Sequence, residues 1–209
     1  MKLNLESIIS TLKDVRDYIV PIKKIGIKFK NIKSIQELQI FIQERSAHVT
    51  QTTLYGYLKT RIGSRYAMMF EDEVFSKSIN IAKWNIYMAA LSDCTLYTFS
   101  FLIDQKNLKE IEAEKVFLTI VDNEKNNGLD VKLSEETKIE FKQRLQKVDW
   151  KNYHSDQPFV NSGLALYEWS PIEEELKKLD KLIVLNSIKL KWNLVEEEFK
   201  SLTKNLNFN

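Results

Sequence analysis

Few residues in this chain can interrupt a helix, and this scarcity constrains the fold more than any other feature. The 209 residues include only five glycines and three prolines, too few for the many turns of a β-rich protein. Long segments instead repeat apolar residues at the helical period. The sequence therefore predicts an all-α fold, a single bundle-like domain of five or more helices.

Capping residues and chain breakers divide the chain into a series of expected helices. Residues 1–33 are predicted to form an N-terminal helix and a lysine-rich connector, and residues 34–205 are predicted to form the core. A loop, KNYHSDQPFVNSGLALYEWS, is expected before the last helix. The expected helices cover about 5–20, 34–62, 77–104, 108–123, 134–150 and 171–203.

Several of these helices have end signals. In the capping box SIQE, Ser34 opens the second helix and Glu37 is placed to reach back to the Ser34 amide, while Gly63 ends the helix. Ser134 is expected to cap the fifth helix. Pro171 is expected at the first position of the last helix, before three glutamates that suit its positive end. The core-facing stripe of that helix is expected to comprise Ile172, Leu176, Leu179, Ile183 and Ile188.

The third expected helix is apolar enough to raise the question of a membrane span. Ile86–Ile103 contains one charged residue, Asp93, and is about as long as a spanning helix. A central aspartate costs on the order of 3 kcal/mol on insertion scales. A helix that is apolar all round is also typical of the centre of a bundle. We therefore expect a soluble protein with this helix at its core.

Composition and charge favour a cytoplasmic location. The single cysteine, Cys94, cannot form an internal disulfide, which fits a reducing compartment. The alternative is peripheral contact with the inner membrane through the lysine-rich segment PIKKIGIKFKNIK. The net charge of +2 gives no general attraction to nucleic acid, so no nucleic-acid partner is expected.

Several familiar chemistries lack their motifs in this chain. There is no GxSxG elbow, no Walker A loop and no GxGxxG sequence. One cysteine and two histidines cannot build a Cys/His zinc site, and no metal or cofactor is expected. Glu44 and His48 lie one helical turn apart, where a side-chain hydrogen bond is favoured over loose metal binding.

Polar residues gather in and after the second expected helix. Of 31 basic residues only five are arginines, yet Arg45, Arg61 and Arg65 fall close together, which favours positions that need the planar guanidinium. A polar stripe at the spacing of a packing seam either lines a groove or faces water; it comprises Arg45, His48, Thr52, Tyr55 and Lys59. We predict an interhelical network or ligand site that draws on Arg45, His48, Tyr55, Lys59, Arg61, Arg65, Tyr66, Glu71, Asp72, Lys83 and Asp93.

Two pairings are expected within this network. Arg61 and Arg65 are near enough in sequence to pair with the acidic run Glu71–Glu73. Asp93 needs a partner if it is both buried and charged. An arginine or the protonated His48 from the second helix is expected to supply that partner.

Long stretches of the chain carry a resemblance to a known family. They are RSAHVTQTTLYGYLKTRIGSRYAMMFEDEVFSKSINIAKW, ALSD, VDW, ALYEWSPIEEELKKLD and IVLNSIKLKW. These stretches, which cover most of the chain from Arg45 to Trp192, resemble a family of small bacterial proteins whose members commonly carry the label esterase. The matching residues outside the predicted network include Gln51, Ser78, Asn80, Trp169, Pro171, Asp180, Asn186 and Ser187.

The resemblance implies a carboxylic-ester hydrolase of unfamiliar design. Such an enzyme needs an activated nucleophile and an oxyanion hole. The candidate serines are Ser46, Ser78, Ser92 and Ser187. The conceivable catalytic triads draw on Ser92 or Ser78, His48, and Asp93 or Asp72.

Three functional hypotheses follow. The first is a helical protein whose polar network is structural or binds a partner or a small anionic ligand. The second is the hydrolase that the resemblance implies, and the third is an accessory protein attached peripherally to the inner membrane. No feature of the sequence specifies the substrate, the partner or the oligomeric state.

Overall fold

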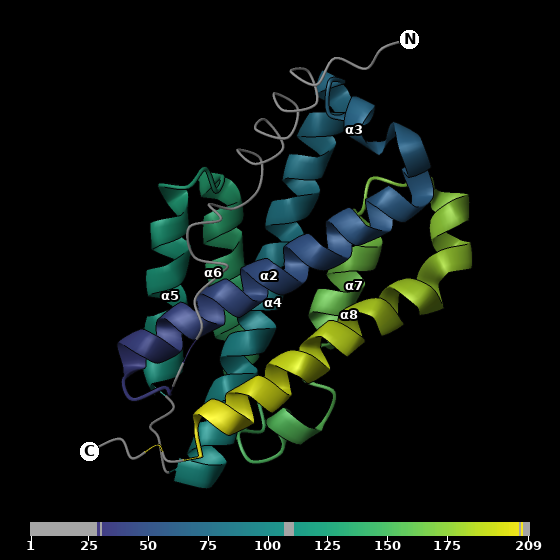
Figure 1. The fold of residues 1–209 in the computed structure, drawn as a ribbon. Coiled ribbons are helices and arrows are strands. Elements are labelled where there is room, and N and C mark those ends of the chain that lie inside the picture. Colours follow the sequence, from purple (N-terminus) through teal and green to yellow (C-terminus); the bar gives the residue numbers. More distant parts are fainter. Residues whose placement is uncertain (1–28, 30, 107–110, 205, 207–209) are drawn as a thin grey trace.

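The computed structural model describes residue 29 and residues 31–106, 111–204 and 206, and all regular structure within them is helical. The elements, shown in Figure 1, are α2 (Ile35–Ile62), η2 (Gly63–Arg65), α3 (Tyr66–Met69), α4 (Glu73–Lys106), α5 (Ile111–Lys125), α6 (Val131–Leu145), η3 (Tyr153–Ser155), α7 (Val160–Trp169) and α8 (Glu174–Leu202). The predicted all-α fold, with a central apolar helix and a long C-terminal helix, is confirmed. The expected helix over residues 5–20 lies outside the described residues, as does most of the lysine-rich connector.

Helix α4 forms the centre of the fold. It packs against α2, α5, α7 and η3, and every residue from Ala90 to Ser100 is buried. In the described part of the chain it is the one helix long and apolar enough to cross a membrane, and 83% of its most apolar window is buried inside the protein. Burial of this kind is usual for the core helix of a soluble protein. It is consistent with the expected soluble fold.

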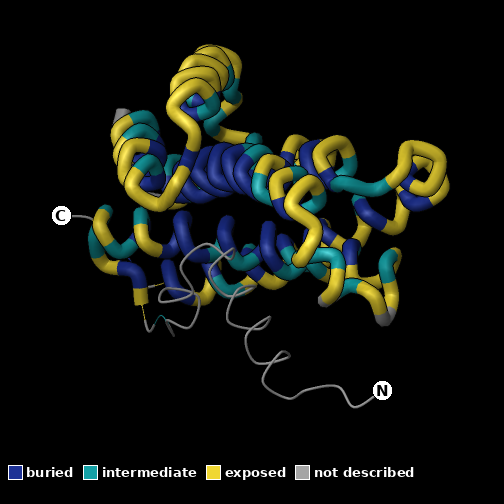
Figure 2. Tube along the Cα trace, turned by 90° about the horizontal axis from the view of Figure 1, so that it is seen from above, coloured by how far each residue is buried: buried dark blue, intermediate teal, exposed yellow. Residues whose placement is uncertain are grey.

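The other helices pack around α4. Helices α2 and α8 contact each other, and α7 contacts both α4 and α8. Helices α5 and α6 run side by side as a hairpin at another side of α4 (Figure 1). Figure 2 shows that the buried residues lie between the packed helices, while exposed residues cover their outer sides.

The ends of α2 follow the sequence signals closely. The Ser34 hydroxyl accepts a hydrogen bond from the Glu37 amide at 3.2 Å. The Glu37 carboxylate accepts from the amide of Lys33 at 2.6 Å, one residue before the predicted Ser34 amide. Gly63 ends the helix with a φ of 66°, a backbone conformation that favours glycine.

Several of the expected boundaries are wrong, including the end of the fifth expected helix near residue 150, since α6 ends at Leu145. Helix α6 begins earlier than expected because Asp130, not Ser134, is its N-cap and accepts from the Leu133 amide at 3.1 Å. The expected loop before the last helix contains α7. Sequence signals for α7 are weak, because its N-cap position is Phe159, which offers no capping side chain, and Gly163 lies within its 10 residues.

The last helix starts later than expected and turns a different side to the core. It begins at Glu174 rather than Pro171. Leu179 and Ile183, expected in the core, are 78% and 67% exposed. The buried apolar residues of α8 are Val184, Ile188, Trp192, Val195, Phe199 and Leu202. Helix α8 therefore carries apolar residues on two sides, and periodicity alone does not tell which side packs.

Candidate functional site

The buried carboxylate of Asp93 lies at the N-terminus of α7. The Ser162 backbone N–H donates to Asp93 Oδ2 at 2.7 Å, and the Asn161 side-chain amide donates to Oδ1 at 3.2 Å. The free N–H groups and the dipole of a helix favour a negative charge at this end. Asp93, which is fully buried on α4, thus fixes α7 against the central helix.

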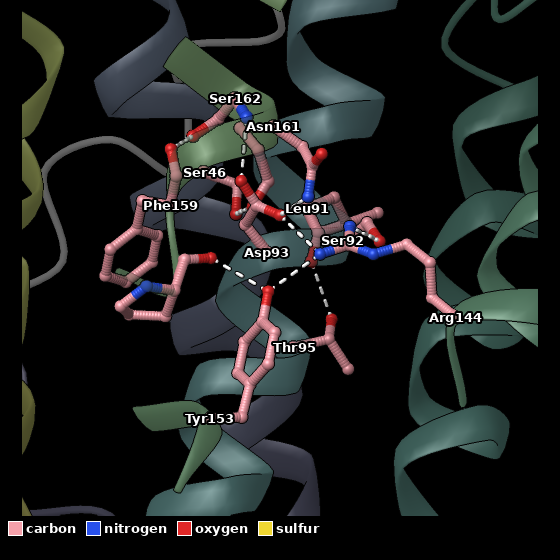
Figure 3. Close-up of polar contacts among 12 residues, drawn as sticks. Ser46, Leu91, Ser92, Asp93, Thr95, Arg144, Tyr153, Phe159, Asn161 and Ser162 are labelled. Carbon is pink, nitrogen blue, oxygen red and sulfur yellow. Dashed lines mark hydrogen bonds and ion pairs between the residues drawn. The ribbon is translucent and has the colours of Figure 1, made fainter. Parts of the chain in front are cut away.

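Arg144 of α6 completes this network, as Figure 3 shows. Its Nη2 donates to Asp93 Oδ1 and to the Tyr153 hydroxyl, both at 2.7 Å, and its Nη1 donates to the Ser92 hydroxyl. Burial raises the pKa of Asp93, while the charge of Arg144 and the hydrogen bonds from α7 oppose this rise. The carboxylate therefore has partners from two helices.

The predicted partner of Asp93 from the second helix is wrong. Asp93 is paired with Arg144, whereas His48 lies on α2 with Arg45 and with Lys191 of α8 nearby. Burial, together with the charges of Arg45 and Lys191, lowers the pKa of His48. The arginine scarcity that drew attention to the second helix applied equally to Arg144, one of only five arginines in the chain.

The same network holds the segment that leads into α7. The Tyr153 hydroxyl donates to the Pro158 carbonyl at 2.9 Å. The Ser162 hydroxyl donates to the Phe159 carbonyl at 3.0 Å and accepts from the Trp192 indole N–H at 3.0 Å. Hydrogen bonds therefore connect the η3–α7 segment to α6, α4 and α8, and this segment is positioned as one wall of a groove.

A groove of about 710 Å³ lies between the η3–α7 segment, α7 and α8. Its apolar lining includes Phe101, Phe159, Leu164, Leu185, Ile188 and Trp192. Its polar lining includes His154, Gln157, Asn186, Lys189, Asn193, Glu196 and Lys200. None of these polar side chains belongs to the network predicted from the sequence.

Close packing of α7 on α8 forms the floor of this groove. The rings of Phe159 and Trp192 stack with centroids 4.1 Å apart and planes inclined by 7°. Gly163 permits the approach, because a Cβ at this position would lie 3.2 Å from a Leu185 methyl carbon and 3.6 Å from one of Ile188. The floor is therefore a fixed apolar surface.

The wall of the groove is held in a defined conformation. His154 Nδ1 lies 3.2 Å from the Ser100 hydroxyl oxygen, which also accepts from the His154 amide at 3.0 Å. Gln157 has a φ of 47°, in the left-handed region that residues other than glycine seldom adopt. Such conformations persist where the surroundings enforce them, and they are found at functional sites.

Two of the predicted arginines tie α2 to α8. Arg45 forms a bidentate salt bridge with Glu198, in which both N–O distances are 2.6 Å. Arg61 pairs with the buried Asp180, whose carboxylate also accepts from the Tyr57 hydroxyl at 2.9 Å. These positions use the guanidinium fork as predicted, but their partners lie more than a hundred residues away in the sequence.

The expected pairing of Arg61 and Arg65 with the acidic run is wrong. Arg65 is exposed and forms no ion pair with another described residue, and Lys59 and Glu71 are exposed as well. Asp72 instead caps α4 by accepting from the Phe75 amide at 2.9 Å. The chain reverses at η2 without bringing these charges together.

The remaining predicted residues lie among aromatic rings, with Tyr55 and Tyr66 partly buried and Lys83 buried. Tyr66 and Tyr55 contact Phe70, with ring centroids 5.1 and 6.2 Å from it. Burial raises the pKa of Tyr55 to about 12 and also raises the pKa of Tyr66. Lys83 lies 4.7 Å from the centre of the Trp84 ring, and burial lowers its pKa to about 8.

A second buried network, absent from the sequence predictions, joins α2, α4 and α5. Glu124 is fully buried and accepts hydrogen bonds from Gln43, from the Tyr87 hydroxyl at 2.9 Å and from Asn127 at 2.7 Å. In the sequence DNEKNNG this glutamate resembles a surface residue, so no local signal identifies it.

The predicted catalytic triads do not assemble among the described residues. The Ser78 hydroxyl donates to the Val74 carbonyl at 2.9 Å, and Ser92 accepts from Arg144. Neither serine contacts His48. A different Ser–His contact joins Ser100 and His154, but Ser100 is fully buried and its hydroxyl donates to a backbone carbonyl, which does not activate it as a nucleophile.

Comparison with known proteins gives no match to a family model, a curated protein or a solved structure. The resemblance to the family labelled esterase therefore stays a prediction. Within the described ranges, no group of three or more His, Cys, Asp and Glu side chains is arranged to hold a metal ion. The groove and its supporting network are the features that a functional proposal has to explain.

Proposed function

We propose that this protein binds an amphipathic ligand in the groove between α7 and α8. The apolar body of the ligand lies on the aromatic floor, and an anionic head lies at the edge that carries lysines and amides. The main observation in support of this proposal is a groove of about 710 Å³ whose aromatic floor adjoins this polar edge. Ligand sites for small molecules commonly have volumes of about 300–1,000 Å³ and this distribution of polarity.

The floor supports an apolar ligand because its one polar group is already occupied. The Trp192 indole N–H donates to Ser162 and the Trp192 ring is itself buried beneath Phe159. The accessible floor is therefore the partly exposed apolar surface of Phe101, Phe159, Leu164 and Leu185. Covering such a surface gains roughly 25 cal/mol for each Å² removed from water. A hydrocarbon chain or a ring system gains this energy without leaving a buried donor unpaired.

The edge supports an anionic head on grounds of charge. Lys189 and Lys200 line the groove against a single carboxylate, Glu196, which lies 3.4 Å from Lys200. Lys189 forms no ion pair with any residue that the structure describes. The amides of Asn186 and Asn193 supply neutral donors and acceptors along the same edge.

The buried network supports the groove without entering it. Asp93 and Arg144 connect the wall to α4 and α6 through Tyr153 and Ser162, so the wall does not need to be ordered by the ligand. Rigid supports of this kind raise affinity by reducing the entropy lost on binding. The polar network is therefore assigned a structural role, and ligand binding is assigned to the groove beside it.

Calorimetric titration with dodecanoate, kept below its micelle concentration, tests the proposal. We expect saturable binding at one site and weaker binding of dodecyltrimethylammonium, which has the same chain and the opposite charge. Leu164→Gln places a polar group in the floor and is expected to raise the dissociation constant of dodecanoate roughly tenfold, which corresponds to about 1.4 kcal/mol of binding free energy. Lys189→Gln is expected to weaken dodecanoate but not the cationic amphiphile.

Matched exposed positions supply the controls. Val131→Gln on α6 and Lys178→Gln on α8 replace an exposed apolar residue and an exposed lysine outside the groove lining. They are expected to leave dodecanoate binding unchanged. Absence of saturable binding in the parent protein, or equal losses in the groove and control variants, would overturn the proposal.

A further inference from the structure

His154 lies between the central helix and the groove. It belongs to η3, it lines the groove, and its ring meets the Phe101 ring edge to face with centroids 5.7 Å apart. Its Nδ1 atom lies 3.2 Å from the hydroxyl oxygen of Ser100, which is fully buried on α4. Because Nδ1 faces the core, Nε2 is the ring nitrogen that can face the groove.

The hydrogen bonds of Ser100 determine the tautomer of His154. The Ser100 hydroxyl donates its only proton to the Trp150 carbonyl at 2.7 Å. Its oxygen accepts from the His154 amide at 3.0 Å, which leaves one lone pair to face Nδ1. An unprotonated Nδ1 would place two lone pairs against each other, so Nδ1 carries the proton and donates to Ser100. In the neutral ring, Nε2 is then a hydrogen-bond acceptor.

The end of the groove beside η3 presents acceptors to a ligand. His154 is half-buried, and its Nε2 forms no hydrogen bond with any residue that the structure describes. Glu196 and Lys200 line the same end, because Phe199 between them packs on Phe101 with ring centroids 5.6 Å apart. Lys200 is paired with Glu196 at 3.4 Å, which leaves little net charge there. A ligand group that donates a hydrogen bond therefore fits this end best.

The other end of the groove differs in its chemistry. Lys189 lines it and forms no ion pair with a described residue. From Lys189 to Glu196 helix α8 rises by about 10 Å, at about 1.5 Å per residue. The apolar ring of Phe159, stacked on Trp192, lies between the two ends. A ligand that satisfies both ends has an anionic group, an apolar chain and a hydrogen-bond donor, in that order.

We propose that the ligand of the groove is a hydroxylated amphipathic acid, whose hydroxyl donates to His154 Nε2 and whose carboxylate lies beside Lys189. This inference rests on the proposed function and names the ligand class that the groove selects. Ser100 is a positioning residue, because it fixes the tautomer and the orientation of the ring. A second carboxylate in place of the hydroxyl is disfavoured, since it has no proton to donate to Nε2 and lies near the charge of Glu196.

Calorimetric titration at pH 8, where imidazole side chains are ordinarily neutral, tests this ligand class. The probe is ω-hydroxydodecanoate, which is dodecanoate with a hydroxyl on its last carbon. We expect it to bind roughly tenfold more tightly than dodecanoate, the effect of one net hydrogen bond. Dodecanedioate, with a second carboxylate at the same position, is expected to bind more weakly than the hydroxy acid.

Two variants of His154 separate recognition of the hydroxyl from packing of the wall. His154→Asn keeps an amide where Nδ1 meets Ser100 but has no acceptor at the Nε2 position, and it is expected to abolish the tenfold difference between the two ligands. His154→Gln restores an acceptor near that position and is expected to keep most of the difference. Lys189→Gln is expected to weaken both ligands by the same factor, because both carry the carboxylate.

A measurement without ligand tests the assignment of the tautomer. Nitrogen-15 NMR of the free protein at pH 8 should show the proton of His154 on Nδ1, in a signal that His154→Asn removes. If neither dodecanoate nor the hydroxy acid binds, the proposed function fails together with this inference. Four results would overturn this inference alone: dodecanoate binding with no gain from the hydroxyl, tighter binding of dodecanedioate, equal loss of the gain in the two His154 variants, or a proton on Nε2.

Discussion

Removal of Arg144 should destabilise the protein more than removal of any exposed arginine. Arg144→Leu deletes the hydrogen bonds to Asp93, Ser92 and Tyr153 at once. Breaking a buried ion pair from one side typically costs about 3–5 kcal/mol. Two features reduce this cost: Asp93 keeps its donors on α7, and the Arg144 side chain is 25% exposed, so water reaches the vacated site. We expect a loss of about 2–4 kcal/mol at pH 7.

The loss should depend on pH in a defined direction. Burial already raises the pKa of Asp93 above its ordinary value of 3.8, and loss of the Arg144 charge raises it further. The folded variant then holds the Asp93 proton more tightly than the unfolded chain does. Its stability relative to the parent protein therefore improves as the pH falls, and the deficit should shrink from pH 7 to pH 5.

Urea unfolding midpoints at the two pH values measure this effect. Arg65→Leu is the matched control, because Arg65 is exposed and has no ion pair among the described residues; its cost should be within about 0.5 kcal/mol. Hydrogen exchange of the Tyr153 and His154 amides should become faster in Arg144→Leu only. Equal losses for the two arginines, or a deficit at Arg144 that does not change with pH, would refute the assignment of Asp93 and Arg144 as a buried pair.

Three further perturbations test other parts of the structure. The parent protein should gain stability as the pH rises from 8 to 10, because burial lowers the pKa of Lys83 from 10.5 to about 8 in the folded state, while the unfolded chain still binds the proton in that interval. Lys83→Met should remove this gain. Urea midpoints measured across the interval give the difference between the variant and the parent protein. Asp180→Asn should cost about 1–3 kcal/mol, since it weakens the charged contact between α2 and α8, whereas Asp122→Asn at an exposed ion pair should cost less than about 1 kcal/mol in the same urea assay. Gly163→Ala should change stability by less than about 1 kcal/mol, because helix propensity offsets the close contact with Leu185, but calorimetry should show weaker dodecanoate binding in the narrowed groove.

Local sequence signals were sufficient for the helical class and for the ends that depend on neighbouring residues. Scarce glycine and proline predicted an all-α fold, and Ser34, Glu37 and Gly63 fixed the ends of α2 to the residue. Asp93 within an apolar helix correctly indicated a buried charge that needs a partner. These inferences succeed because capping and helical periodicity act over only a few residues.

The tertiary structure decided which side of a helix packs into the core and which residue pairs with a buried charge, because the local sequence offers several equivalent possibilities for each. Leu179 and Val184 are both apolar residues of one helix, yet only Val184 packs into the core, because α8 has an apolar residue set on each side and α2 and α7 cover one of them. The partner of Asp93 was similarly open. Arg144 became that partner because α6 and α7 approach the Asp93 side of α4, a contact between residues 51 positions apart in the chain.

The groove has no counterpart in any continuous stretch of the sequence. Its floor combines Phe101 of α4, Phe159 before α7 and Trp192 of α8. No signal in the sequence indicated that these three residues meet, since Phe159 lies in the expected loop and Trp192 outside the predicted core stripe of the last helix. They form a surface because Gly163 lets α7 approach α8 while the Tyr153 network holds the adjoining wall apart. The sequence by itself determined that the chain is helical, where α2 begins and ends, and that a buried charge must be paired. Only the packing of those helices decided where an apolar surface remains open to a ligand. A groove forms where side chains from segments distant in the sequence leave space between them, and no local sequence pattern specifies that space.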